Sequence, residues 1–327
     1  MITVAQFNDL VKNATVQWSK ARGEFPTVRQ MLANIKQVSA KTSEYSGISS
    51  AQTARRRTDG DDAYKGTLKQ GYTKTFNQSE IALQFDITKQ MRMFDKYDEI
   101  MKRMREMGRG AERRMELDLA SLLFNAWATT YVNIDGETVT TATPDGLALI
   151  DNAHTAKTGA TFSNEIATTH SPLDVDVLEK LEEVGNGFID EADGRAIPCM
   201  FDTIITGRHA PTVHMVSRIL NSELRQGTAN NDVNTSKMYK HLIVPFLDVN
   251  PATEVRDSTK SKYVFLANLG NKDENGFVME VSQDIRLETP EQVFENGAWQ
   301  FQTTGLYDFG ATRPAFISGT KGDGTAV

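Results

Sequence analysis

The longest regular pattern in the chain is helical and covers residues 95–128. Its apolar positions recur at spacings of three and four, so they form one stripe. The members of this stripe are Tyr97, Met101, Met104, Gly108, Ala111, Met115, Leu119 and Leu122. Asp95 is a favourable N-cap, and at 1.5 Å per residue the segment would extend about 50 Å. Because the second half, from Leu117 to Trp127, is almost entirely apolar, the pattern predicts one long helix that enters the core.

The segment before this helix, residues 42–80, carries few large apolar side chains. They are Tyr45, Ile48, Tyr64, Leu68, Tyr72 and Phe76. A segment that buries so little apolar surface does not offset the entropy that it loses on ordering. We therefore expect this arm to lie on a neighbouring copy of the chain, which is typical of an assembly protein rather than an enzyme.

The arm and its continuation divide into three patterns. Residues 39–62 are rich in Ser, Thr, Gly and charge, which predicts a flexible link. Residues 64–76 place their apolar side chains at even positions, and the glycines and threonines between them favour a strand over a helix. Residues 81–87 alternate strictly between apolar and polar, which predicts a strand with one buried face. A turn near Asn77 would join these two strands into a long projecting hairpin.

The rest of the chain alternates between short helical and short strand patterns. Helices are predicted at the N-terminus with Phe7, Leu10, Val11, Ala14 and Trp18 on one face, from Pro26 to Ile35, after a Ser171 cap, and from Pro211. Strands are predicted in a hairpin over 131–141 that turns at Asp135-Gly136, and at 202–206, 241–247, 262–268, 277–281 and 299–309, the last continuing past Pro314 to Ile317. Since the helices come mostly early and the strands mostly late, the fold class is predicted to be α+β.

Composition limits the class of protein further. A chain of 327 residues can form two domains and a sizeable core. The net charge of −7 indicates solubility and argues against a dedicated nucleic-acid-binding protein. A lone cysteine, Cys199, excludes an intrachain disulfide and suits a reducing compartment. The chain has no apolar run of about 18 residues and no signal-peptide pattern, so neither a membrane span nor secretion is expected.

The residues that could support catalysis do not form a known motif. His209 and His214 are five apart with no Glu between them, unlike the HExxH pair of zinc proteases. Cys199 precedes a strand and has no neighbour that would lower its pKa, so we expect a small buried hydrophobe. Residues 319–325 lack the order of a phosphate-binding loop, and we expect a frayed tail there. Residues 230–234 lack the ligands of a calcium loop. We predict no catalytic residue, no cofactor and no metal site.

Several stretches, taken in their order along the chain, carry a family resemblance. They are Asp145-Gly146-Leu147-Ala148-Leu149 followed by His154 and Thr161-Phe162-Ser163-Asn164, Ile219-Leu220-Asn221-Ser222-Glu223 running into residues 227–234, and Tyr307-Asp308-Phe309-Gly310-Ala311-Thr312-Arg313-Pro314 followed by residues 319–322. With the helical N-terminal arm, the extended hairpin, the long helix and the late mixed sheet, these stretches make the chain resemble the major capsid proteins of tailed bacteriophages.

The resemblance implies the tailed-phage major capsid fold and its division of the chain. The implied parts are an N-terminal arm at 1–54, an extended loop (E-loop) hairpin at 55–90, a peripheral domain at 91–196 with the spine helix at 95–128, a mixed α/β axial domain at 197–282, and returning strands with a flexible C-terminal tail at 283–327.

The resemblance also implies a structural function without enzymatic activity. The subunits would form hexamers and pentamers that close into an icosahedral head around double-stranded DNA, and the protein would reside in the virion capsid after assembly in the host cytoplasm. The implied partners are further copies of the chain, a separate scaffolding protein (since only a short arm precedes the loop), portal and decoration proteins, and DNA packaged without sequence-specific binding; no membrane is implied.

Contacts between subunits are expected on the loop and on the spine helix. The candidate residues are Arg55, Arg56, Arg57, Tyr64, Leu68, Tyr72, Phe76, Arg105, Arg109 and Arg113. Some family members crosslink a loop lysine to a neighbour's asparagine. Lys65, Lys69 and Lys74 lie in the corresponding segment, but no residue pattern here supports that chemistry.

Three other functions remain open at this point. An encapsulin-type nanocompartment has the same fold but encloses cargo proteins. A soluble hydrolase would use His154 or His209, and a DNA-binding protein would act through Arg55–Arg57 and the arginines of the spine helix. Size-exclusion chromatography separates a shell protein, which elutes as capsomers or megadalton particles, from an enzyme, which elutes as a small oligomer. Neighbouring terminase and portal genes would favour the phage over the nanocompartment, and salt-dependent affinity for duplex DNA would support the DNA-binding protein.

Overall fold

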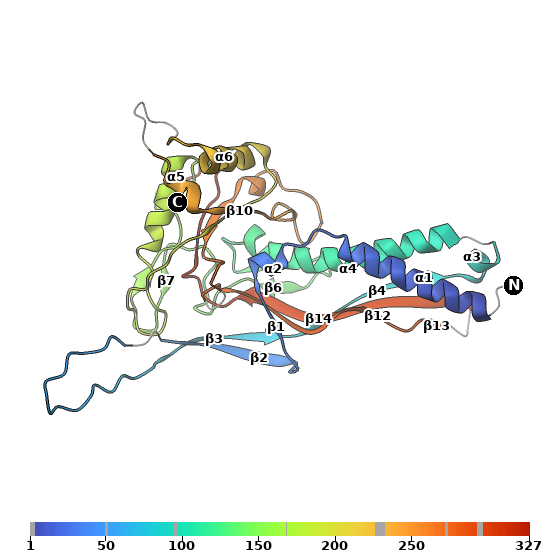
Figure 1. Cartoon of the computed structure of the whole chain (residues 1–327), viewed down its shortest axis with the longest axis horizontal. Helices are drawn as coiled ribbons and strands as arrows, with labels where there is room; N and C mark the ends of the chain where they lie inside the picture. Colours follow the sequence, from blue (N-terminus) through green and yellow to red (C-terminus); the bar gives the residue numbers. More distant parts are fainter. Residues whose placement is uncertain are drawn as a thin grey trace.

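An elongated body with a projecting arm makes up the molecule (Figure 1). The computed structural model describes residues 4–49, 52–94, 97–167, 169–225, 233–271, 274–292 and 297–327. A five-stranded sheet lies along the long axis beneath two long helices, and a four-stranded sheet forms the centre of a second unit at the other end (Figure 1). This mixed architecture confirms the predicted α+β fold class.

Helices cover both sheets. They are α1 (Val4–Gly23), α2 (Arg29–Leu32), α3 (Lys89–Met93), α4 (Tyr97–Phe124), α5 (Val175–Gly185) and α6 (Ala210–Asn221), with short 3-10 turns η1 (Ser236–Met238) and η2 (Lys260–Lys262). The long spine helix is confirmed as α4, and the predicted cap Asp95 lies outside the described residues. It ends at Phe124 rather than Ala128, because other donors satisfy its last carbonyls. Lys260 Nζ donates to the Phe124 carbonyl at 3.0 Å, and the Asn125 side chain donates to the Ser121 carbonyl at 3.1 Å.

The five-stranded sheet joins the two ends of the chain. Its strands are β1 (Asn34–Gln37), β4 (Ser79–Ile87), β12 (Phe277–Leu287), β13 (Glu291–Gln292) and β14 (Trp299–Ala311). β14 is central, with β12 and β13 antiparallel to it on one side and β4 on the other, and β1 runs parallel to β12. Ile35, which we expected in a helix, lies in β1, because the backbone becomes extended at Ala33 after a single helical turn.

The four-stranded sheet is buried between helices and loops. Its order is β10 (Lys240–Ile243), β9 (Thr203–Thr206), β11 (Val264–Ala267) and β15 (Ile317–Thr320). We expected the last long strand to continue past Pro314, which is wrong. The chain leaves β14 at Ala311 and enters the second sheet as β15, since proline lacks the N–H that a central strand needs.

The C-terminal residues are part of the fold. β15 is buried along its whole length, and beyond it the Gly324 N–H donates to the His170 carbonyl at 2.7 Å. The His170 N–H donates in turn to the Thr325 carbonyl at 2.8 Å. The frayed tail that we expected at 319–325 is therefore wrong: the mixture of small and polar residues there pairs with the body.

The remaining elements are two small hairpins and the N-terminal cap of α5. β5 (Thr130–Val132) pairs with β6 (Thr138–Thr140) across Asp135-Gly136 as predicted, and β7 (His154–Thr155) pairs with β8 (Thr161–Phe162). The Gly136 φ of +80° is the left-handed conformation that such a turn requires. α5 is capped by Asp174, which accepts from the Val175 N–H, and not by Ser171.

Helix α5 and strand β12 pack in different parts of the molecule. α5 packs on β15 and β11, whereas β12 belongs to the sheet under α4. β12 runs across the implied boundary at residue 282, and the division of the chain at residues 196 and 282 stays a prediction.

Candidate assembly surface

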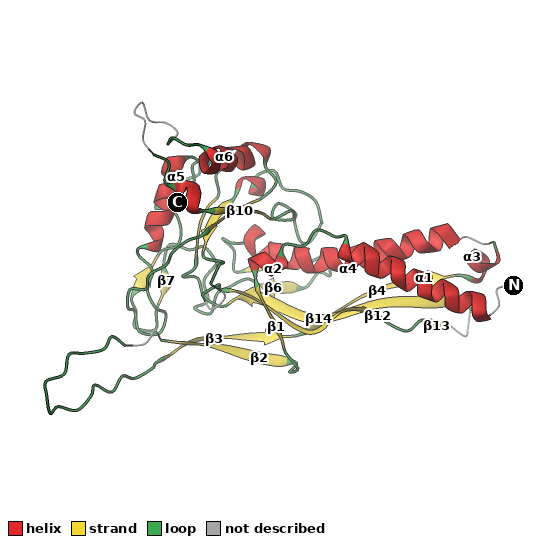
Figure 2. Ribbon diagram, viewed as in Figure 1, coloured by secondary structure: helices red, strands yellow, loops and turns green. Residues whose placement is uncertain are grey.

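The projecting arm is a loop held by a two-stranded hairpin. β2 (Thr42–Ile48) pairs antiparallel with β3 (Gln70–Asn77), and residues 52–69 between them extend away from the body (Figure 2). The predicted flexible link over 39–62 is therefore wrong for residues 42–48. The predicted pairing of residues 64–76 with 81–87 is also wrong, since β3 pairs with β2 and β4 pairs with β14. Asp308 Oδ2 accepts from the Asn77 N–H at 2.7 Å and fixes the passage from β3 into β4.

The outer part of the arm exposes apolar and basic side chains together. Ile48 and Leu68 are 68% and 67% exposed, and Tyr64 is 44% exposed. The Arg55 guanidinium stacks on the Tyr64 ring at 3.9 Å, and the Tyr64 hydroxyl donates to Gln52. Arg56 and Arg57 are also exposed. Exposed apolar side chains gathered on one projecting segment are typical of interaction surfaces, and the contacts that these residues make stay a prediction.

Two of the expected contact residues belong to the arm's root instead. Phe76 is 1% exposed and packs edge-on against Tyr45 at 5.4 Å between ring centroids. Phe76 was therefore wrongly included among the expected contacts between subunits. The even spacing of the apolar residues in 64–76 does not reveal which of them the rest of the chain covers. Tyr72 is half-buried, and Lys157 Nζ lies 5.6 Å from the centre of its ring.

The expected contacts on the spine helix are engaged within the chain. Arg105 Nε donates to Gln17 Oε1 on α1 at 2.6 Å. Arg109 pairs with Glu106 at 3.0 Å, and Arg113 pairs with Glu254 at 2.7 Å. The arm and α4 extend in opposite directions (Figure 1), so the structure does not bring the two predicted groups of residues together in one subunit.

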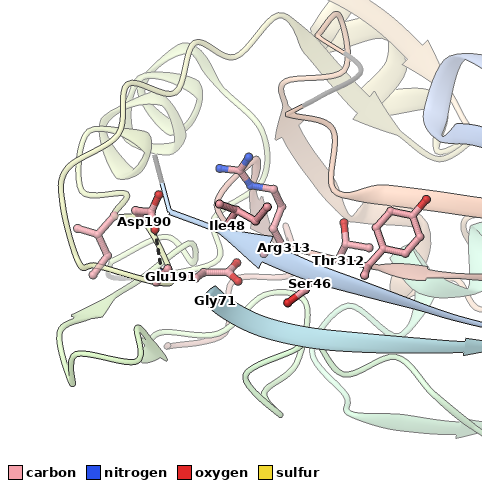
Figure 3. A pocket seen from close by; sticks show the side chains of 11 residues that line it. Ser46, Ile48, Gly71, Asp190, Glu191, Thr312 and Arg313 are labelled. Atoms are coloured by element: carbon pink, nitrogen blue, oxygen red, sulfur yellow. Dashed lines mark hydrogen bonds between the residues drawn. The ribbon is translucent and has the colours of Figure 1, made fainter. Parts of the chain in front are cut away.

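A cavity of about 260 Å³ lies where the arm meets the body (Figure 3). Its lining comes from β2, β3, the segment before the second sheet and the end of β14, and consists of Tyr45, Ser46, Gly47, Ile48, Gly71, Ile189, Asp190, Glu191, Ala192, Thr312 and Arg313. Gly47 and Gly71 face each other where the pairing register shifts, and a Cβ at Gly71 would lie 3.2 Å from the Gly47 carbonyl oxygen. Two glycines thus allow the strands to approach closely at the arm's root.

Glu191 is a largely buried acid in this cavity. Burial raises the pKa of its carboxyl group to about 7, with Asp145 and Asp190 adding to the rise and Arg313 opposing it. Its Oε1 atom has no hydrogen-bond partner among the described residues. The Arg313 side chain points toward Ile48 rather than toward Glu191 (Figure 3). The root of the arm therefore holds a carboxyl group that is most stable in its neutral form.

We expect Glu191→Gln to make the stability of the unassembled protein less sensitive to a rise in pH from 5 to 8. A folded-state pKa above the ordinary value means that stability is full below pH 4.5 and is lost as the pH rises toward 7. The loss above pH 7 would reach about 2–3 kcal/mol. Urea unfolding at pH 5 and pH 8 measures it, with the exposed Glu183→Gln as control. A Glu191→Gln variant that loses stability with pH as steeply as the wild type would contradict the assignment.

The other candidate chemical residues have structural partners. His154 and His170 are buried, with His154 Nδ1 2.8 Å from Asp145 Oδ2 and His170 Nε2 3.1 Å from Glu165 Oε1. His209 Nδ1 lies 2.9 Å from Thr212 Oγ1. Burial raises the pKa of the Cys199 thiol to about 12, which agrees with a packing role. The part of the chain that the structure describes contains no helix long and apolar enough to cross a membrane.

Comparison with known proteins identifies the family to which the chain belongs. A family model described as phage capsid protein matches residues 71–318, which is more than two thirds of the chain. The chain belongs to the phage capsid protein family. The match covers the spine helix and most strands of both sheets, although β1 lies outside it, and it confirms the resemblance that the motifs carried. A search of curated proteins finds no match.

Solved structures show that the capsid protein shares its fold with distant relatives. A virus-like particle from Pyrococcus furiosus matches at 10% identity with a TM-score of 0.50, over 94% of this chain and 98% of that one. A Mycobacterium phage Adephagia structure matches at 12% identity with a TM-score of 0.50, over 91% of this chain and 90% of that one. The predicted capsid fold is thereby confirmed over most of the chain.

Membership in the family settles the coarse function. The capsid protein is a structural component of the virion and not an enzyme, and it acts as a self-associating subunit. His154 and His209 accordingly need no catalytic role. The arm was the feature that sequence reasoning located, whereas the cavity at its root was missed, because its lining comes from four separate segments.

Proposed function

We propose that this capsid protein forms hexamers and pentamers that close into an icosahedral head around double-stranded DNA, and that each arm lies over an adjacent subunit. The observation that carries the proposal is the arm loop, residues 52–69, which extends from the body with Tyr64 and Leu68 exposed, beside the exposed Ile48 at the end of β2. In water these side chains gain stability only when another surface covers them. Neighbouring copies supply that surface in a closed shell, where interfaces of about 2,000–5,000 Å² are typical of obligate assemblies.

The arm also gives each subunit a means of contacting the next one in a shell. An overlapping arm lets every subunit contact a neighbour head to tail, and such contacts close into rings when the rotation permits. The mild negative charge of the chain suits a container for DNA, because a surface that binds phosphates strongly would resist packaging. A separate scaffolding protein, a portal and decoration proteins complete the proposed set of partners.

The test is a variant in which residues 53–67 are replaced by a short Gly-Ser turn. We expect native circular dichroism and an unchanged unfolding midpoint, because the loop contributes little to the chain's own core. Shells seen by negative-stain microscopy should disappear, with free capsomers or monomers in their place. A control that keeps the loop length and replaces Asp61 and Asp62 with serine should assemble. Normal shells from the shortened variant would overturn the role of the arm.

An encapsulin-type shell is the second candidate. It is favoured by the match to the virus-like particle from Pyrococcus furiosus, which covers 98% of that chain. The contents of purified shells separate the two functions. Nuclease-protected double-stranded DNA of uniform length supports a phage head, and co-purifying cargo protein without DNA supports a nanocompartment.

A further inference from the structure

The last residues of the chain, 321–327, are here called the C-terminal segment, and backbone hydrogen bonds hold them against a buried histidine. The His170 N–H donates to the Thr325 carbonyl at 2.8 Å, and the Gly324 N–H donates to the His170 carbonyl at 2.7 Å. An isolated antiparallel bridge between the two flanking residues extends the pairing. Because only a few bonds at a chain end are involved, this segment can open without unfolding the rest of the molecule.

The imidazole ring of His170 adds a bond of its own to the C-terminal segment. The ring is fully buried, and its Nδ1 atom accepts from the Lys321 N–H at 3.2 Å. An imidazole nitrogen can accept a hydrogen bond only while it carries no proton. The proton of the neutral ring is then on Nε2, which lies 3.1 Å from Glu165 Oε1. The observed bond to Lys321 therefore requires the neutral ring.

Charged side chains act on the ring from its own segment and from the C-terminal segment. Burial, followed by the charge of Lys321, disfavours the protonated ring, whereas Glu165 and Asp323 favour it. The net effect lowers the pKa of His170 below its ordinary value of 6.5. Glu165 is also engaged elsewhere, since its Oε1 atom accepts from Trp127 Nε1. The neutral ring is thus the favoured form in the closed arrangement.

The other elements around the ring contribute mainly uncharged side chains. Trp127, beyond the end of α4, packs edge-on against it at 5.7 Å between ring centroids. Tyr263, just before β11, contacts Trp127 and stays neutral, because burial raises the pKa of its hydroxyl to about 12. The half-buried Lys262 lies beside the C-terminal segment, with its carbonyl oxygen 2.6 Å from the position of a Cβ on Gly322. α5 packs on β15 through buried residues that carry no charge.

We propose that His170 is a pH-dependent anchor of the C-terminal segment, and that acidification releases residues 321–327 from the second unit. Protonation places a hydrogen on Nδ1, which then faces the Lys321 N–H as a second donor across 3.2 Å. Two donors cannot bond to each other, and the new N–H can donate to Thr320 Oγ1, which lies 3.4 Å away. The Lys321 peptide must therefore move, and it leads directly into the paired residues.

Release would change the surface of the second unit within a single subunit. The Lys321 ammonium group lies 5.4 Å from the centre of the Trp127 ring and covers it. When the C-terminal segment leaves, this indole face becomes accessible and the chain gains a free end. The anchor is a property of the single subunit, so it does not depend on the proposed function.

The direction of the pH effect follows from the lowered pKa of His170. The pairing is fully stable above pH 6.5, and it loses stability as the pH falls from 6.5 toward the pKa of the closed state. One proton is coupled to the opening, so the ratio of released to held segment rises by at most about tenfold for each pH unit in this window. Below the pKa of the closed state both forms carry the proton, and the ratio stops changing.

A spin label at the chain end measures the release. Val327→Cys is labelled in a Cys199→Ser background, which removes the single native thiol. Electron paramagnetic resonance spectra of the whole chain are then compared at pH 7.5 and pH 5.5, with circular dichroism at both to verify the fold. We expect the mobile fraction of the label to grow by about threefold or more at the lower pH.

His170→Asn retains a hydrogen-bond acceptor and removes the titration. An asparagine side-chain oxygen can accept from the Lys321 N–H and carries no charge at either pH. We expect the label to stay held at both pH values in this variant. The matched control is His214→Asn, an exposed histidine on α6, which should respond to pH as the wild type does. An equal response from the wild type and His170→Asn, or no response from the wild type, would overturn the proposal.

Hydrogen exchange of the wild-type chain provides a second measurement, which needs no substitution at His170. After correction for intrinsic exchange rates, a peptide covering residues 321–327 should lose protection between pH 7.5 and pH 5.5, whereas a peptide covering β11 should keep it. Unchanged protection of the C-terminal peptide would contradict the anchor even if His170→Asn failed to fold. Loss of protection in both peptides would show acid unfolding of the second unit instead of a local release, and would also overturn the proposal.

Discussion

Replacing Glu112 with alanine should remove a large part of the stability of the folded chain. Glu112 is 1% exposed on α4 and pairs with two arginines, Arg22 at the end of α1 and Arg29 in α2. Arg22 continues to Asp284 of β12 at 2.7 Å, so this one cluster joins both N-terminal helices, the spine helix and the sheet. Removing one partner of a buried pair leaves the others with uncompensated charge, which typically costs about 3–5 kcal/mol.

Urea unfolding of the unassembled protein measures this loss. The matched control is Glu106→Ala on the same helix, whose carboxylate pairs with Arg109 but is 62% exposed. Solvent screens a surface pair of this kind, so the control should change stability by about 0.5 kcal/mol or less. Equal effects from the two substitutions would show that the cluster does not hold α1 and α2 on the spine helix. Replacing Glu116, which accepts from the Val28 N–H at 2.9 Å, should also weaken the contact between α2 and the spine helix.

The sequence predicted the elements whose signal is local. The stripe of α4 repeats over several turns, β9 places Ile204 and Ile205 between two threonines, and the hairpin at Asp135-Gly136 carries its own turn residues. Each of these patterns depends on periodicity or turn chemistry within about ten residues, which the chain displays directly.

The elements that were missed depend on partners distant in sequence. β2 has the polar composition of a linker, and it becomes a strand because β3 pairs with it across the arm loop, from Thr42 with Asn77 to Ile48 with Gln70. The end of β15, Gly319 and Thr320, was taken for a tail, since only the pairing with β11 distinguishes it from a small polar terminus. Short edge strands of this kind are defined by tertiary context more than by propensity.

Only part of the candidate assembly surface could be predicted from the sequence, because the rest depends on residues that are distant along the chain. Exposed basic and apolar residues of the arm, Arg55 to Arg57 with Tyr64 and Leu68, could be named from composition because a segment poor in apolar residues has no core of its own. The cavity at the root of the arm could not be identified from the sequence. Its lining residues, such as Ile48 and Arg313, come from segments more than two hundred residues apart, and only the tertiary fold places them together.

Gly108→Ala should destabilise the protein, although the same change in most helices is stabilising. Alanine normally gains about 0.5–1 kcal/mol over glycine in a helix interior. Here α1 crosses α4 so closely that a Cβ at Gly108 would lie 2.6 Å from the Trp18 carbonyl oxygen, which belongs to the backbone and cannot rotate away. The helices must separate, and overpacking of this kind costs about 1–3 kcal/mol.

The neighbouring glycine of α4 provides the matched control, because the two positions differ in what the added methyl group meets. At Gly110 the new Cβ would lie 3.2 Å from Leu83 Cδ2, the end of a flexible and 43% exposed side chain. Gly110→Ala should therefore be neutral or stabilising. Urea unfolding compares the two variants, and trypsin cleavage at Lys12 and Lys20 of α1 should accelerate only in Gly108→Ala. If both variants gain stability, α1 does not lie against α4 at this glycine, and the N-terminal helix must pack elsewhere in the subunit.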